Sequence, residues 1–414
     1  MLKHIVAATK LPFEFCASLI GVDPDQFSDW MEGRKPVPGF ILPELSSVLG
    51  VTEAEILNPG NQSRPPSAEA MTPAVWFKLR DDNLIARDRE MVGLVRKLGF
   101  FLGQLQRARG ERLLEYSPLF GTVRAGVDRK LPPSAQGIQA AQAFRGASSL
   151  QHGQSGIGEL IRPHFRRLGI LLVESPLKGS KLEGCCFSVG SGEAPTPCIF
   201  ANSFGSTWFR RNAVLMHELC HAIFDLEDDP VAIDFIESDQ GNSTHTLLNE
   251  ARAQAFAQEA LVPKTVLIQF ANKFGLDWTR LSANDLGRLV AEAHVEKQLL
   301  LKAALDAGFI DDDQRVAYES VDCAAAVREY STHALNTREY LRLRAEESPK
   351  WIGENRNTDI GTRSLRMPVR YVDEVIKALN EGFITVGKAA EMAMMEKPTF
   401  LKRFHNLIQL PELA

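Results

Sequence analysis

One short segment restricts the possible folds of this chain more than any other feature of its sequence. From Val214 to Glu227 the chain reads VLMHELCHAIFDLE, with His217 and His221 four residues apart. Residues four apart lie on the same face of an α-helix, one turn from each other. Apolar residues recur at helical spacing around the two histidines, so the sequence predicts a helix from about Ser206 to Glu227.

Two imidazoles on one face of a helix can bind one tetrahedral metal ion. We therefore predict His217 and His221 as ligands of a Zn²⁺ ion. Glu218 directly follows the first histidine, so it can flank the ion without binding it. In that place a carboxylate can take a proton from the attacking water, and we predict Glu218 as the general base.

The third ligand has to come from another part of the chain, and Glu250 is the strongest candidate. It lies among apolar residues on a second predicted helix from Leu247 to Pro263, where a carboxylate is costly to bury unless it meets a cation. The alternative third ligands are Asp225, Asp228, Asp229 and His245, of which the three aspartates are close to the first helix and His245 is expected on a loop.

A simpler interpretation of these side chains needs no metal. Glu250 would then pair with Arg211 or Arg252, as buried carboxylates often do. Cys220, between the two histidines, is interpreted as a small core residue. Hydrolysis would also need an oxyanion-stabilising donor, for which the sequence selects none of the candidates His245, His294 and Tyr318.

Composition and charge argue against several classes of protein. The 414 residues are 44% hydrophobic and 24% charged, which is typical of a globular chain with two to four domains. The net charge of -5 shows no excess of cations for nucleic acid, and no apolar run is long enough for a membrane span. Scattered cysteines and the lack of a convincing export signal predict a cytoplasmic protein.

We predict a mainly α fold with a small β-sheet, an α+β protein. Four segments are expected: a helix-turn-helix-like domain at 1–58, a linker and helical connector at 59–138, the domain with the metal ligands at 139–310, and a mostly helical C-terminal domain at 311–414 that could contain a second helix-turn-helix-like element. The strand CIFANS, near Pro197 to Asn202, is either an exposed sheet edge that accepts a peptide or an ordinary inner strand.

The motifs NAVLMHELCHAIF and NEARAQAFAQEALVP, preceded by two predicted strands, resemble the ImmA/IrrE family of metallopeptidases. The resemblance covers roughly residues 139–310. It implies a zincin-like peptidase domain flanked by helical domains, with His217, His221 and Glu250 as zinc ligands and Glu218 as general base. The chain departs from the family at Arg252 and Gln254 and in its added C-terminal segment.

The resemblance also implies a protein substrate, because family members act on helix-turn-helix repressors or are toxins paired with them. We expect a zinc-dependent endopeptidase that cleaves a regulatory protein, a helix-turn-helix repressor or antitoxin, and so controls phage, mobile-element or stress genes. The alternative is a toxin–antitoxin component or transcriptional regulator that acts by binding, with little proteolysis.

The would-be recognition helix of the first domain disfavours DNA as a direct partner without excluding it. Its acidic residues precede its two cations and would repel phosphates; they are Asp23, Asp25, Asp29 and Glu32, before Arg34 and Lys35. Docking to a partner repressor is the competing interpretation. The sequence leaves the oligomeric state open, including a homo-oligomer, and suggests no membrane partner.

Overall fold

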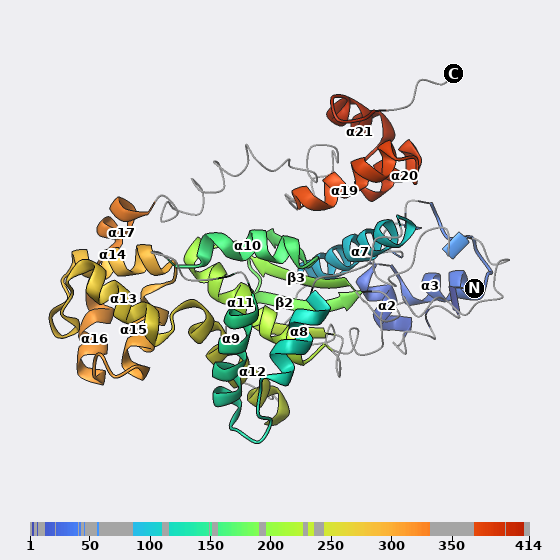
Figure 1. Ribbon diagram of the computed structural model, residues 1–414. Coiled ribbons are helices and arrows are strands. Elements are labelled where there is room, and N and C mark those ends of the chain that lie inside the picture. Colours follow the sequence, from blue (N-terminus) through green and yellow to red (C-terminus); the bar gives the residue numbers. More distant parts are fainter. Residues whose placement is uncertain are drawn as a thin grey trace.

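The computed structural model describes residues 2–3, 6, 13–20, 22–39, 41–42, 45, 56–57, 86–109, 116–148, 150, 156–189, 196–226, 231–235, 244–331, 368–393 and 395–409. Within these ranges the fold is α+β, mainly helical with one small mixed sheet, which confirms the predicted fold class (Figure 1). Among the same residues, no helix is long and apolar enough to cross a membrane.

The elements follow one another along the chain as bounded here. They are α2 (Phe13–Leu19), α3 (Pro24–Met31), α7 (Ala86–Ala108), α8 (Tyr116–Ala125), α9 (Pro133–Ala147), α10 (Gly158–Arg167), β1 (Leu171–Ser175), β2 (Leu182–Val189), β3 (Thr196–Asn202), α11 (Trp208–Phe224), β4 (Val231–Phe235), α12 (Thr244–Leu261), α13 (Lys264–Phe274), a short 3₁₀ helix (Trp278–Arg280), α14 (Ala283–Ala293), α15 (Lys297–Asp306), α16 (Asp312–Ser320), α17 (Ala324–Tyr330), α19 (Val369–Asn380), α20 (Val386–Met392) and α21 (Lys397–Phe404).

The sheet has the strand order β1-β3-β2-β4. β3 runs parallel to β1 and antiparallel to β2, and β2 is antiparallel to β4. The predicted strand CIFANS is β3, which has a neighbour on each side and is buried along its whole length. It is therefore an inner strand, and the interpretation of this strand as an exposed edge is wrong.

Helices cover the two faces of the sheet, and glycines let them approach closely. On one face, a Cβ added at Gly99 of α7 would lie 2.4 Å from the Cys198 sulfur on β3. On the other face, α11 packs so closely on β2 that a Cβ at Gly184 would lie 2.8 Å from Val214. α7, which falls in the segment predicted as a connector, thus completes the core on the sheet's second face.

The N-terminal and C-terminal helices share this second core with α7. Phe27 and Trp30 of α3 and Tyr371 of α19 are buried in the same cluster as the side chains of α7 and one face of the sheet. Arg109, just after α7, forms ion pairs with Glu374 and with Glu381, the latter at 2.9 Å. Residues far apart in the sequence therefore meet on one central helix.

Some predicted features differ from the structure or lie outside its described residues. Residues 121–135, whose glycines and paired prolines indicate a loop, contain the end of α8 and the start of α9. Leu57, whose place in the apolar pattern of the first segment indicates a core residue, is 56% exposed. Gly21, which fits the turn of the predicted helix-turn-helix, and the stretch VWFKLR at 75–80, which resembles a short strand, lie outside the described residues. The helix-turn-helix assignment and the four segment boundaries therefore stay predictions.

Candidate metal centre

Helix α11 carries the two histidines, and its start is fixed by local hydrogen bonding. The Thr207 hydroxyl caps the helix by accepting from the Arg210 N–H at 3.0 Å. Almost every residue of α11 is buried, so the helix lacks the polar, solvent-exposed face that surface helices usually have. The predicted helix is confirmed, and it places His217 and His221 one turn apart inside the protein.

Helix α12 packs against α11 and carries Glu250. It begins at Thr244 and ends at Leu261, two residues before Pro263, close to the predicted bounds. α9 supports α12 from another side, where Gly137 lies so near that an added Cβ would meet the Arg252 carbonyl oxygen at 2.2 Å. The position of Glu250 is therefore set by packing on two helices.

The three predicted ligands meet at one point. Glu250 Oε2 lies 3.0 Å from His217 Nε2, and Glu250 Oε1 lies 3.5 Å from His221 Nε2. The two Nε2 atoms are 2.9 Å apart, and one ligand atom from each residue lies within 4.8 Å of the others. Ligands of a tetrahedral zinc are about 3.4 Å apart for bonds of about 2.1 Å, so these separations fit a single metal ion.

Asp225 lies behind His221 and not among the ligand atoms. Its Oδ2 is 2.7 Å from His221 Nδ1, so the ring donates from Nδ1 and keeps the Nε2 lone pair for a cation. Arg252 pairs with the other oxygen of Asp225, and Arg211 pairs with Glu174 at 2.8 Å. Both arginines considered as partners of Glu250 thus have carboxylates elsewhere.

The alternative ligands Asp228 and Asp229 stay untested, and His245 lies in a different kind of element from the one expected. Asp228 and Asp229 lie outside the described residues. His245, expected on a loop, belongs to the first turn of α12.

The electrostatics of the site favour positive charge. Burial alone would lower the pKa of His221, but hydrogen bonds to Asp225 and Glu250 raise it to about 10, with a further contribution from Glu218. Burial would likewise raise the pKa of Glu250, but hydrogen bonds from His217 and His221 hold it well below its usual range. Several carboxylates around one point stabilise a cation there, whether a proton or a metal ion.

Glu218 is fully buried and its carboxylate lies against strand β2. A Cβ added at Gly184 would lie 2.5 Å from Glu218 Oε1, so this glycine leaves the space that the carboxylate occupies. Burial raises the pKa of the Cys186 thiol, two residues further along β2, and the nearby Glu218 carboxylate raises it further. Cys220 is also fully buried, as expected for a core residue.

Two of the three candidate oxyanion donors, Tyr318 and His294, have contacts in other parts of the protein. The Tyr318 hydroxyl donates to the Trp278 carbonyl and accepts from the Leu281 N–H. The His294 ring packs edge-on against Trp208, at the start of α11. No side-chain position is described for His245, so the donor stays unassigned.

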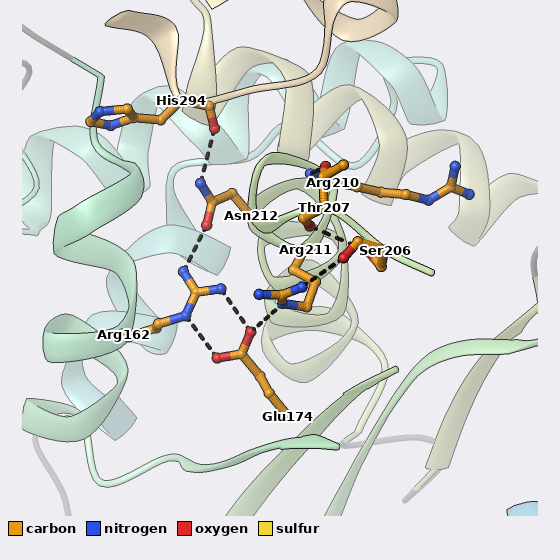
Figure 2. A network of polar contacts seen from close by, with 8 residues as sticks. All are labelled: Arg162, Glu174, Ser206, Thr207, Arg210, Arg211, Asn212 and His294. Atoms are coloured by element: carbon orange, nitrogen blue, oxygen red, sulfur yellow. Dashed lines mark hydrogen bonds and ion pairs between the residues drawn. The ribbon is translucent and has the colours of Figure 1, made fainter. Parts of the chain in front are cut away.

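A buried polar network that the sequence did not reveal anchors the start of α11 (Figure 2). Glu174 of β1 accepts from Arg162 of α10 at 2.7 Å and from Arg211 of α11 at 2.8 Å. Asn212 accepts from Arg162 at 2.7 Å and donates to the His294 carbonyl at 2.9 Å. The network fixes the helix one to two turns before the histidines, and its partners are too far apart in sequence to be paired by inspection.

Comparison with known proteins adds an independent observation. Residues 165–304 match the IrrE N-terminal-like domain of the Peptidase_M78 family. A search of curated proteins finds no match to the chain. The matched region contains the strands, α11, α12 and all three converging side chains. This part of the chain is therefore similar to the metallopeptidase domain of the ImmA/IrrE family.

Proposed function

We propose that the protein is a zinc-dependent endopeptidase that cleaves a regulatory protein, a helix-turn-helix repressor or antitoxin. The observation that carries the proposal is the convergence of His217, His221 and Glu250 inside a domain similar to a peptidase family. Two imidazoles and one carboxylate are a ligand set typical of catalytic zinc, which leaves a coordination position for water or substrate.

In the proposed hydrolysis, three residues would bind the metal ion and a fourth would transfer protons. His217, His221 and Glu250 would hold the ion, which would polarise the scissile carbonyl and make water a stronger acid. Glu218 would take the proton from the attacking water and deliver it to the leaving amine. Its closeness to His221 is supported by its contribution to the raised pKa of that ring.

An edge of the sheet could bind the substrate as an added strand. In the described part of the sheet, β4 pairs with β2 alone and follows the histidine helix in the chain. We propose β4 (Val231–Phe235) for this role, in place of the inner strand β3.

We favour a protein over DNA as the partner. In the loop after α3, Arg34 pairs with Asp29 at 2.7 Å and also with Glu32, and Lys35 pairs with Asp29 at 2.7 Å. Cations already neutralised by neighbouring acids contribute little to phosphate binding. A cytoplasmic location is consistent with six free cysteines, all buried.

A Glu218→Gln variant tests whether hydrolysis is the function. Glutamine keeps the size of the side chain but cannot take the proton from water. We expect cleavage of the partner repressor to fall by at least about 100-fold, while bound metal stays at the wild-type level. The readouts are a cleavage assay on gels and metal analysis of the same samples.

Glu259→Gln, on α12 and away from the ligand atoms, serves as the control and should cleave normally. If Glu218→Gln still releases the repressed genes as well as the wild type does, the protein acts by binding. That result would replace the peptidase by the toxin–antitoxin or regulator alternative.

A further inference from the structure

The contact behind His221 extends beyond the histidine. Asp225 receives the His221 Nδ1–H through Oδ2 at 2.7 Å and the Arg252 guanidinium through Oδ1. Asp225 directly follows α11 as its C-cap, whereas Arg252 lies on α12, two residues after Glu250. The carboxylate therefore links a ring on one helix to a cation on the other.

Arg252 is itself held from several sides. Its guanidinium lies over the Phe224 ring, 4.9 Å from the centroid, and donates to Asn249 Oδ1 at 3.1 Å. The side chains of Arg252 and Asp225 are each 13% exposed. Removing one partner of an ion pair so far removed from water leaves the other as an uncompensated buried charge, so the two side chains hold each other in place.

We propose that Asp225 and Arg252 are positioning residues for the metal ligands, an inference that rests on the proposed metal centre. Asp225 fixes the tautomer and orientation of His221, and Arg252 fixes Asp225 while holding α12, and with it Glu250, against the end of α11.

The chemistry of imidazole explains why such a contact matters. A neutral histidine carries its proton on either ring nitrogen, and a metal ligand must keep Nε2 free of it. An acceptor at Nδ1 selects that form before the metal arrives and restricts rotation of the ring. Without the acceptor, binding would also have to select the tautomer and order the ring, which weakens affinity.

The test is the zinc affinity of four purified full-length variants, measured by competition with a chromogenic chelator. Asp225→Ala removes both contacts, Arg252→Met removes the cation but keeps the length of the side chain, and the double variant avoids a buried unpaired guanidinium. Asp306→Ala is the matched control, because Asp306 ends α15 and contacts α12 through Gln258 at 2.9 Å without touching the histidines.

We expect zinc affinity to weaken by about 10- to 100-fold in Asp225→Ala, and by a smaller factor in Arg252→Met. The double variant should bind zinc no more weakly than Asp225→Ala, because Arg252 acts through Asp225. The visible spectrum of bound Co²⁺ should change in the Asp225 variants and stay unchanged in Asp306→Ala. A purely structural role would lower the unfolding temperature without altering this spectrum.

Two negative results are distinguishable. Wild-type protein that binds no zinc would overturn the proposed metal centre and this inference with it. Wild-type protein that binds zinc, with Asp225→Ala or the double variant matching its affinity and its Co²⁺ spectrum, would overturn the inference and leave the proposed function intact. Additive losses in the double variant would overturn the claim that Arg252 acts through Asp225.

Discussion

Glu174 is a single carboxylate shared by two buried guanidinium groups, those of Arg162 and Arg211. Burial alone would raise its pKa, but the two arginines hold the pKa of Glu174 well below its usual range. The charged form is therefore the one that the folded protein stabilises. Because Arg211 belongs to α11, the same carboxylate helps to fix the helix that carries the histidines.

Glu174→Gln should lower the free energy of unfolding by about 3 kcal/mol near neutral pH, since it leaves two buried arginines without their anion. The folded-state pKa lies below the unfolded one, so the charge stabilises the fold above about pH 4 and this stabilisation is lost as the pH falls further. The difference in the free energy of unfolding between wild type and Glu174→Gln, measured by urea unfolding, should therefore become smaller in acid.

Glu183→Gln is the matched control for this prediction. Glu183 pairs with Arg210, the neighbour of Arg211, but the Arg210 side chain is 41% exposed. Loss of this pair should cost about 0–1 kcal/mol. A pH-independent effect of Glu174→Gln, or one no larger than that of Glu183→Gln, would show that the buried network does not stabilise the fold.

The residues of the site differ in how far the sequence revealed them. His217, His221 and Glu250 were predicted because their spacing and setting are typical of a zinc site, and the structure brings them together. Asp225 is a candidate ligand by sequence, since a carboxylate one turn after a histidine has the right spacing both to bind the metal and to accept a hydrogen bond from the histidine ring. The orientation of the His221 ring decides that Asp225 meets Nδ1 and not Nε2.

At the scale of elements, α9 approaches α12 closely near the site. Gly137 faces the α12 backbone, where an added Cβ would lie 2.2 Å from the Arg252 oxygen and 2.9 Å from the Phe256 nitrogen. Backbone atoms cannot move aside as a flexible side chain can. A methyl group at this point would push apart the two helices that position Glu250.

Gly137→Ala should therefore destabilise the protein by about 1–3 kcal/mol despite the higher helix propensity of alanine. Gly146→Ala, in the same helix but with no atom within 4 Å of the added Cβ, should be neutral or stabilising by up to about 1 kcal/mol. Urea unfolding of both variants measures the difference. Equal stabilities would mean that α9 does not limit the position of α12.

Sequence patterns predict the individual helices and strands better than they predict which elements lie next to each other in the fold. Strong apolar patterns predict β1, β3 and the two site helices, and all four are present, whereas the sequence does not predict β4, which lies in a polar segment. Gly121 and a pair of prolines make residues 121–135 resemble a loop, but α8 ends only at Ala125 and Pro133 starts α9, so a loop of this length is wrong at both ends. The inner place of β3 depends on pairing with β1 and β2, which a buried strand's own sequence does not reveal.

At the scale of the whole molecule, the sheet separates two hydrophobic cores. One core, on the side of α11, contains the apolar residues around the metal centre and the helices from α8 to α17. The other core unites α7 with the N-terminal helices and with α19 to α21 (Figure 1). The N-terminal and C-terminal helices thus share a core with the face of the sheet opposite α11. The order of the segments along the chain does not predict this shared core.

The claim on which the account depends is that α11 and α12 together bind one metal ion. Its most direct test is the metal content of purified wild-type protein and of Glu250→Gln, with Glu259→Gln of the same helix as control. We predict about one zinc per chain in the wild type and the control, and little in Glu250→Gln. A Glu250→Gln protein that keeps its full complement of zinc, or a wild type that holds none, would contradict the account.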